Sequence, residues 1–243
     1  MIPTKMKRQK DIISMFDKIS ERYDILNHIL TIGIDRKWRR ESCKLSLKAF
    51  NNDHIEYILD VACGTGDMCL QWIQVSKFKE VKINKIIGID PSERMIKRGQ
   101  DKISGVDFIR GSASYLPFKN DFADILSISF GLRNITDRKE ALKEFFRVLK
   151  QNGLLVVLEF LKIEESSFRS RLIMSYIGNI LPFIGGLISK DYDAYLYLAT
   201  SIQHFITPQL LLKEIESSGF RILLYKRLSM SISTLIVAKK EVG

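Results

Sequence analysis

The residues best suited to chemistry are a glycine loop and an acidic residue further along the chain. Residues 59–67 read LDVACGTGD and place Gly64 and Gly66 directly after an apolar run. Glycines in such a turn let a ligand approach the backbone, because they carry no side chain. Asp90 ends the next apolar run, where a carboxylate can accept hydrogen bonds from both hydroxyls of a ribose. This pairing predicts a nucleoside-containing cofactor.

Three further residues indicate which cofactor the loop suits. A dinucleotide fingerprint requires a third glycine, and that position is Cys69. Asp67 sets a negative charge beside Gly66, where a pyrophosphate needs an open helix N-terminus. Asp60 is placed to meet an ammonium group. The loop therefore favours a cationic sulfonium cofactor with an amino-acid tail over NAD, with a plain turn as the remaining alternative.

Two more polar loops follow predicted strands and would lie at the same edge of a sheet. Ser112 and Ala113 come after the strand predicted at 106–110, and Ser129 closes the strand predicted at 123–129. Ligands bind at the carboxyl ends of strands in open α/β sheets. These loops are expected to enclose a purine and a transferable group, although each one alone is equally typical of an ordinary loop.

The elements that must position these residues alternate between short apolar runs and longer amphipathic segments. This rhythm predicts a parallel sheet covered by helices on both faces. Strands are predicted at 55–62, 85–90, 106–110, 123–129 and 154–160, and helices at 67–77, 92–104 and 137–150, the last stopped by Asn152 and Gly153. A helix at 208–218 and two β-rich stretches at 220–227 and 231–238 follow, the latter as an antiparallel hairpin at the sheet edge.

Two regions lie outside the alternation. Residues 1–50 are expected to form two or three helices. Residues 161–207 include the apolar run 172–189, which Pro182 and a pair of glycines interrupt and charged residues flank, so a helical lid is predicted rather than a membrane span. We expect one domain over 1–243, with a helical cap (1–50), a cofactor-binding core (51–160), a helical lid insertion (161–207) and a C-terminal helix and hairpin (208–243).

Composition limits the class of protein. The chain has 243 residues, of which 46% are hydrophobic and 27% charged, as is typical of globular proteins. Its three cysteines lack CxxC spacing, so neither a disulfide framework nor a metal site is predicted. The basic N-terminus is followed by no apolar core of a secretory signal, which favours a cytoplasmic location. The net charge of +10 is consistent with binding to nucleic acid or to an anionic membrane, or with a solvated surface that binds neither.

Four stretches of the chain resemble a known family. They are 15–40, 59–67, 128–160 with its run FGLRN at 130–134, and 195–205 with 217–220. They resemble the class I S-adenosylmethionine-dependent methyltransferases, and within these the demethylmenaquinone and ubiquinone-pathway C-methyltransferases. The resemblance implies a Rossmann-like α/β fold with a mainly parallel seven-stranded sheet, one antiparallel edge strand, N-terminal helices and a helical lid.

The resemblance also implies how S-adenosylmethionine is bound. The positions that correspond to the family's cofactor-binding residues are Asp60, Gly64, Thr65, Gly66, Asp90, Ser112, Ala113 and Ser129. Two segments depart from the family's pattern. Ser112 stands where Asp or Asn is usual, and residues 197–201 read YLATS where the family often has leucine-proline-glutamate-serine.

The implied reaction is methylation of a ring carbon of a prenylated hydroquinone. Demethylmenaquinol is favoured, with the methoxy-polyprenyl-benzoquinol of ubiquinone biosynthesis as an open alternative. Arg133 is expected to stabilise the phenolate or hold a water that accepts its proton, Asn134 to orient the quinol oxygen, and Tyr23 to close over the cofactor. The side chain of His204 could accept a proton as a general base, but a lone histidine among apolar residues is more often structural.

The prenyl tail implies peripheral contact with the inner face of the membrane, and related enzymes are commonly homodimers. Trp38 with the neighbouring arginines 36, 39 and 40 is open to three interpretations: a lid anchor, a membrane-facing patch or a solvated helix end. Nucleic acid is not expected, because no RNA-binding module accompanies the basic charge. A methyltransferase that acts on another small lipid or on RNA remains an alternative, and so does a non-enzymatic binding protein, which Thr65 and Asp90 disfavour.

Overall fold

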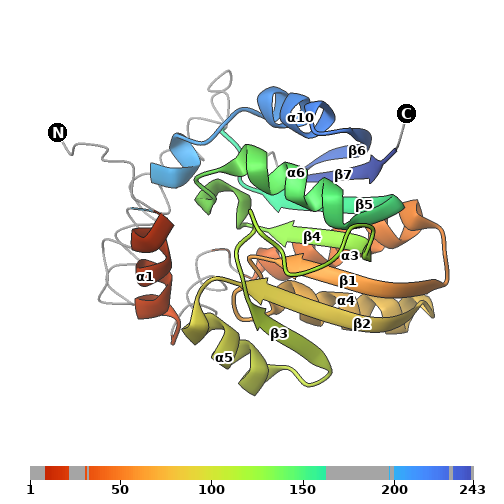
Figure 1. The fold of residues 1–243 in the computed structure, drawn as a ribbon, viewed down its shortest axis with the longest axis horizontal. Coiled ribbons are helices and arrows are strands. Elements are labelled where there is room, and N and C mark those ends of the chain that lie inside the picture. Colours follow the sequence, from red (N-terminus) through yellow and green to blue (C-terminus); the bar gives the residue numbers. More distant parts are fainter. Residues whose placement is uncertain are drawn as a thin grey trace.

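The computed structural model describes residues 9–21, 31, 33–162, 197, 200–229 and 232–241. Its centre is a seven-stranded sheet with strand order β3-β2-β1-β4-β5-β7-β6 (Figure 1). The strands are β1 (His54–Val61), β2 (Lys82–Asp90), β3 (Val106–Arg110), β4 (Ala123–Ser129), β5 (Leu149–Glu159), β6 (Phe220–Leu228) and β7 (Ser233–Lys240).

The first five strands are parallel, and the last two form the predicted antiparallel hairpin. The hairpin places β7 antiparallel against β5 and leaves β6 at the edge. The chain reverses its strand order between β1 and β4, which makes the carboxyl ends of these strands the expected ligand-binding edge. The mainly parallel Rossmann-like sheet is therefore confirmed.

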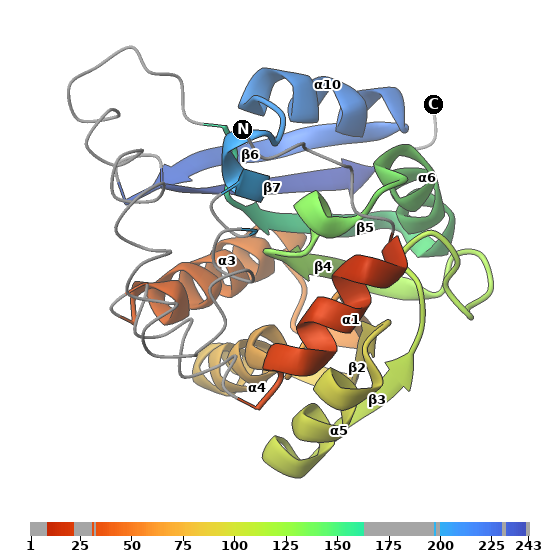
Figure 2. The same ribbon diagram turned by 90° about the vertical axis from the view of Figure 1, so that its left-hand side faces the viewer.

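Helices cover both faces of the sheet (Figure 2). α3 (Ile34–Phe50), α4 (Asp67–Lys79) and α5 (Glu93–Lys102) lie on one face, whereas α6 (Arg138–Val148) and α10 (Pro208–Ser217) lie on the other. The buried apolar side chains form two clusters. One cluster contains residues of α6 and α10, and the other contains residues of α3 and α4. α1 (Gln9–Ile19) belongs to neither face and crosses the carboxyl ends of the strands (Figure 1).

Two strands begin at least three residues before the positions expected. β2 begins at Lys82 rather than at residue 85, and β5 begins at Leu149, immediately after α6. The Asn152–Gly153 pair, predicted to stop the helix, instead lies inside β5. The pairing of β5 with β4 shifts register there, and Asn152 adopts a left-handed φ of 66°. The pair therefore accommodates a bulge within a strand.

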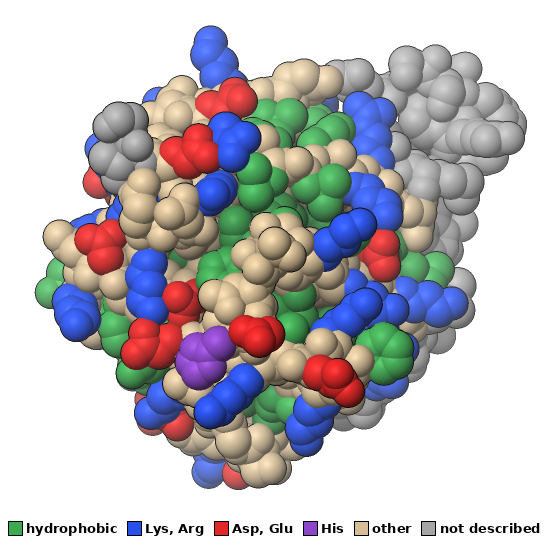
Figure 3. All heavy atoms as spheres, turned by 90° about the vertical axis from the view of Figure 1, so that its right-hand side faces the viewer, with side chains coloured by type: hydrophobic (Ala, Val, Ile, Leu, Met, Phe, Trp, Pro, Cys, Tyr) green, Lys and Arg blue, Asp and Glu red, His purple; other side chains and the backbone are tan. Residues whose placement is uncertain are grey.

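The central part of the predicted lid, residues 163–196, lies outside the described residues, so the lid and the division of the chain stay predictions. Among the described helices, none combines the length and apolarity needed to cross a bilayer. Trp38 and Arg39 are buried, each about 5% exposed, which rules them out as a membrane-facing patch. At the amino ends of the parallel strands, basic and acidic side chains are interspersed rather than gathered by sign (Figure 3).

Candidate active site

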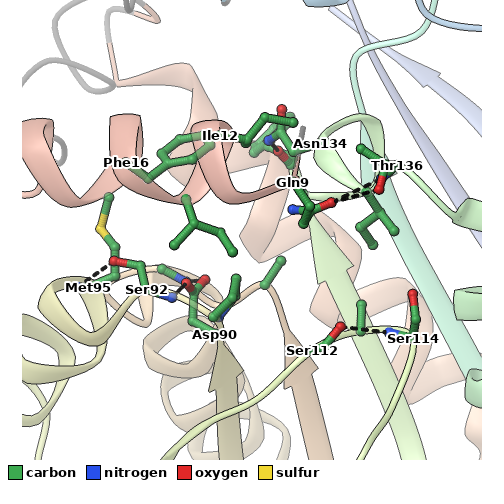
Figure 4. A pocket seen from close by; sticks show the side chains of 18 of the residues that line it. Gln9, Ile12, Phe16, Asp90, Ser92, Met95, Ser112, Ser114, Asn134 and Thr136 are labelled. Carbon is green, nitrogen blue, oxygen red and sulfur yellow. Dashed lines mark hydrogen bonds between the residues drawn. The ribbon is translucent and has the colours of Figure 1, made fainter. Parts of the chain in front are cut away.

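A cavity of about 280 Å³ lies between α1 and the carboxyl ends of the parallel strands. Its lining comes from the loops after β1, β2, β3 and β4 and from one side of α1 (Figure 4). Five predicted cofactor residues line it: Gly64, Asp90, Ser112, Ala113 and Ser129. A second cavity of about 290 Å³ lies near the start of β4, where Lys150 is already paired with Glu56 and Asp124.

α1 is attached to the sheet edge at both of its ends. The side-chain oxygen of Gln9 accepts hydrogen bonds from the backbone N–H of Thr136 at 3.1 Å and from its hydroxyl at 3.2 Å. At the other end, Ser92 donates its hydroxyl hydrogen to Asp17. Phe16 lies between these attachments and faces the cavity (Figure 4). The helix therefore forms an apolar cover over a polar floor.

Asp90 is the acidic centre of that floor. One carboxylate oxygen accepts the backbone N–H of Gly64 at 2.8 Å, and the other accepts the backbone N–H of Ser92 at 2.9 Å. Burial raises the pKa of Asp90 to about 6, and these hydrogen bonds only partly oppose the rise. Each carboxylate oxygen keeps a further lone pair. Asp90 can therefore accept two hydroxyl groups from a ligand in the cavity.

The two loop glycines have different roles. Gly64 lines the cavity, as the sequence predicts, and donates its backbone N–H to Asp90. Gly66 precedes α4 with a φ of 83°, and a Cβ there would come within 2.8 Å of both Ile103 and Phe108. Its missing side chain thus permits close packing of the loop on the sheet rather than access for a ligand.

Thr65 and Asp67 are both joined to α5. Lys102 donates to the Thr65 hydroxyl at 3.1 Å and pairs with Asp67 at 2.6 Å. Thr65 is buried and is not among the described residues that line the cavity. Because Lys102 balances the charge of Asp67, the repulsion of a pyrophosphate expected from Asp67 is weaker than the sequence alone suggests.

Asp60 lies in β1 beneath the loop and is 1% exposed. Its carboxylate accepts hydrogen bonds from Ser127 Oγ at 2.7 Å and from Cys69 Sγ at 3.4 Å. Burial raises its pKa to about 7, against the opposing effects of these partners and of Arg39. It is outside the cavity lining, so its contact with an ammonium group stays a prediction.

We expect Asp60→Asn to remove a specific pH dependence of stability. The folded-state pKa of about 7 exceeds the unfolded value of 3.8, so the folded protein takes up a proton first as the pH falls. The charged carboxylate therefore costs stability above pH 7, and this cost is relieved on acidification. Between pH 8 and pH 5 the wild type should gain about 3 kcal/mol relative to Asp60→Asn in urea unfolding. Parallel pH profiles of the two proteins would contradict this assignment.

The loops after β3 and β4 supply the remaining polar wall. The Ser112 hydroxyl accepts the backbone N–H of Ser114 at 3.3 Å. The Ser129 hydroxyl is buried and has no hydrogen-bond partner within the described part of the chain. A buried hydroxyl without a partner is unfavourable, and one that lines a cavity is satisfied when a polar ligand enters.

Asn134 lines the cavity, whereas Arg133 turns away from it. The chain forms a short 3₁₀ turn, η1 (Leu132–Asn134), which sends these neighbouring side chains in different directions. Arg133 forms a buried ion pair with Glu159 at 2.7 Å, with 6% and 1% of their side chains exposed. It also donates to the Phe130 carbonyl at 2.6 Å. Of the two residues expected to face the methyl group, only Asn134 is among the residues that line the cavity.

Tyr197 is a site residue that sequence reasoning missed. Its hydroxyl donates to Asn134 Oδ1 at 3.0 Å, and four residues later Ser201 accepts a hydrogen bond from Arg133 Nε at 3.4 Å. Burial raises the pKa of Tyr197 above its usual value, so the hydroxyl keeps its proton and remains a donor. The sequence offered a weak signal, because this segment departs from the family's pattern.

Three other residues bear on the predicted site, and the structure describes two of them, His204 and Ser92. His204 is exposed and its Nδ1 lies 2.9 Å from the Thr200 carbonyl, outside the cavity lining. Tyr23 lies outside the described residues. Ser92 was overlooked, although its place before an amphipathic run is typical of a helix N-cap; its hydroxyl accepts the backbone N–H of Met95.

These residues fit a nucleoside cofactor that carries polar groups at both ends. The Asp90 carboxylate suits a ribose, and Ser129 has a buried hydroxyl without a partner in the described chain. The cavity volume is close to the lower end of the roughly 300–1,000 Å³ usual for ligand sites. No cluster of His, Cys, Asp or Glu in the described residues is arranged to hold a metal ion.

A doubly wound sheet with a glycine loop after β1, a cavity-lining acid at the end of β2 and an antiparallel β7 beside β5 is the architecture expected of class I methyltransferases. The solved structures of similar fold agree. A possible histamine N-methyltransferase from Thermotoga maritima matches with a TM-score of 0.60 over 94% of this chain and 99% of that one, at 19% identity. The [4+2]-cyclase SpnF matches with a TM-score of 0.61 over 84% and 81% of the two chains, at 20% identity. Such likenesses show the fold alone.

The chain belongs to the ubiE/COQ5 methyltransferase family, whose model matches residues 3–240. It is 43% identical to a ubiquinone/menaquinone biosynthesis C-methyltransferase of Campylobacter jejuni, over 97% of this chain and all of the relative. It is 37% identical to a demethylmenaquinone methyltransferase of Thermotoga maritima, over 89% and 90% of the two chains. S-adenosylmethionine is accordingly the expected methyl donor.

Proposed function

We propose that this protein transfers a methyl group from S-adenosylmethionine to a ring carbon of a prenylated hydroquinone, with demethylmenaquinol as the favoured substrate. The observation that carries the proposal is the cavity itself. It brings Asp90, suited to a ribose, together with Asn134, from the family-specific run at 130–134, in one enclosed space. The names of the relatives supply the substrate class.

For this reaction the protein mainly has to orient the two substrates and exclude water from the cavity. The sulfonium of S-adenosylmethionine supplies an activated methyl group. A hydroquinone becomes nucleophilic at carbon when its phenolic proton passes to water, and a fixed amide can hold the phenolic oxygen while it does so. When the ring carbon takes the methyl group, the leaving group would be the neutral thioether, and the proton on that ring carbon would then pass to water. Asn134 is fixed by Tyr197 and by the Phe130 carbonyl, to which it donates at 3.4 Å. We therefore assign Asn134 to the quinol oxygen.

Arg133 takes a different part in this proposal from the one expected. Glu159 balances its charge at 2.7 Å, so its field on a phenolate in the cavity is reduced. Its guanidinium instead holds the Phe130 carbonyl, the same oxygen that Asn134 contacts. We assign Arg133 to the shape of the turn that presents Asn134. Tyr23 keeps its proposed place over the cofactor.

The substrate of this reaction carries a tail that partitions into lipid, so we also propose peripheral contact with the inner face of the membrane, for a protein that works in the cytoplasm. A homodimer remains part of the proposal by analogy with related enzymes. Flotation with anionic vesicles at physiological salt tests the membrane contact. Protein left entirely in the bottom fraction would exclude it.

Two reduced substrates distinguish the alternatives. Purified protein is incubated in detergent with methyl-labelled S-adenosylmethionine and either demethylmenaquinol or the methoxy-polyprenyl-benzoquinol. We expect label in the first product. Label in both products would assign the protein to both pathways, and label in the second alone would overturn the favoured substrate. Label in neither, with S-adenosylmethionine still bound, would overturn the quinol proposal and leave the cofactor site intact.

A further inference from the structure

Two stacked phenylalanine rings lie directly beneath the turn that carries Asn134. Phe130 follows β4 and Phe160 follows β5, and their ring centroids are 4.5 Å apart with an interplanar angle of 23°. Trp38 of α3 closes one side of the stack, 6.2 Å from Phe130 and 5.9 Å from Phe160. The stack joins the ends of the neighbouring strands β4 and β5 to α3.

A buried guanidinium lies over each ring of the stack. Arg39 lies 5.0 Å from the centroid of Phe130, and Arg133 lies 5.5 Å from that of Phe160. A cation over an aromatic face is attracted more strongly where water is excluded. Both arginines are also ion-paired: Arg39 to Asp35 at 2.5 Å, and Arg133 to Glu159. Arg39, Phe130, Phe160 and Arg133 therefore form one continuous stack.

The backbone of Phe130 shows what this stack holds in place. Its φ is 58°, in the left-handed region that a bulky side chain adopts only when its surroundings impose it. Its N–H donates to the Leu158 carbonyl at 2.7 Å, and its own carbonyl accepts from Arg133 and Asn134. The orientation of this peptide thus sets the position of the amide that lines the cavity.

Hydrogen bonds alone do not explain why the side chain of Arg39 is buried. Its side chain is 6% exposed, yet its Nε has no acceptor within the described part of the chain. A buried N–H without an acceptor is unfavourable. What the side chain does contact is the ring of Phe130, whose centroid lies 5.0 Å from its guanidinium.

We propose that Arg39, on α3 and outside the cavity lining, is a positioning residue for methyl transfer: it holds the Phe130 ring, and so the left-handed turn that presents Asn134. This inference rests on the proposed function for its turnover assay. On this proposal α3 supports methyl transfer through Phe130 and Asn134, without itself contacting the substrate or the cofactor.

The test uses a charge-neutral pair of substitutions, because Arg39→Met alone removes the cation that forms an ion pair with the buried carboxylate of Asp35. Asp35→Asn/Arg39→Met removes both charges, and the amide oxygen introduced at position 35 can still accept the hydroxyl of Thr31, which lies 2.7 Å from the Asp35 carboxylate. We expect kcat to fall at least tenfold while the S-adenosylmethionine Kd and the urea midpoint stay close to wild type. Arg39→Lys, which keeps the cation, should recover turnover to within about threefold.

Arg138→Met/Glu214→Gln is the matched control. Arg138 pairs with Glu214 at 2.6 Å and lies 5.2 Å from the Phe205 ring, a similar arrangement away from the cavity. This variant should keep its kcat. A full kcat in Asp35→Asn/Arg39→Met would overturn the proposal, and so would equal losses in both double variants, or a loss of kcat that follows loss of folding or cofactor binding.

A second readout does not depend on the substrate. The side-chain amide signal of Asn134 in a ¹H–¹⁵N spectrum, assigned by its absence in Asn134→Asp, should shift in Asp35→Asn/Arg39→Met and return toward its wild-type position in Arg39→Lys. If the wild type methylates neither quinol, the proposed function fails while this signal still tests the positioning. An unmoved signal would overturn the positioning even where turnover is observed.

Discussion

Asp90→Asn is expected to weaken S-adenosylmethionine binding at least about a hundredfold. Hydrogen bonds to a charged group contribute roughly 1.5–3 kcal/mol each, and Asp90 is placed to accept two from a ribose. The substitution also places an NH₂ group against one of two backbone N–H donors, from Gly64 and Ser92, that the carboxylate now accepts. Calorimetric titration of the purified protein measures the loss.

Asp107→Asn provides the matched control, because it removes the same charge from an exposed pair with Lys85 at the edge of the sheet. Its affinity for S-adenosylmethionine should equal that of the wild type. Asp90→Asn binding within about threefold of wild type would show that Asp90 does not hold the cofactor.

The same carboxyl group predicts how affinity changes with pH. With a pKa of about 6, Asp90 is mostly ionised at pH 7 and mostly protonated at pH 5. Because the hydroxyl groups of a ribose donate to the ionised form, wild-type affinity should fall about tenfold across this interval. Asp90→Asn should lack this dependence, and an identical slope in both proteins would contradict the assignment.

Arg133→Met is expected to destabilise the protein by about 3–5 kcal/mol and to abolish most turnover. The substitution leaves Glu159, 1% exposed, as a buried carboxylate without its cation. Arg133→Met/Glu159→Gln removes both charges and should recover most of the stability in urea unfolding. Turnover should stay low in the double variant, because the Phe130 carbonyl has still lost its guanidinium donor.

The double variant separates two interpretations of Arg133. If it recovers turnover together with stability, Arg133 serves only to neutralise Glu159. If the single variant is as stable as the wild type, the buried ion pair carries none of the energy assigned to it. We expect neither outcome.

The sequence predicted the sheet well because each buried strand is an apolar run bounded by turn residues. It also predicted Asp90 and Gly64 correctly as cavity residues, since the carboxyl end of a parallel strand is a position that order along the chain defines. The register shift that absorbs Asn152 depends on pairing with β4, which is not local information.

The predictions about side-chain direction were less successful. Arg133 and Asn134 are adjacent, and only the 3₁₀ turn decides which of them lines the cavity. The cover formed by α1 depends on a contact between Gln9 and Thr136, 127 residues apart. The hydroxyl of Thr65 accepts a hydrogen bond from Lys102, which approaches from α5. Such tertiary contacts leave no periodic signal in the chain.

The central claim is that the cavity beneath α1 delivers a methyl group to a ring carbon of a quinol. The most direct test is a reaction of the wild type with methyl-¹³C S-adenosylmethionine and demethylmenaquinol, with the product analysed by ¹³C NMR. We predict a labelled methyl group bonded to the quinone ring carbon, and its absence in Asp90→Asn. A labelled methoxy group, or label in no product while S-adenosylmethionine stays bound, would contradict this claim.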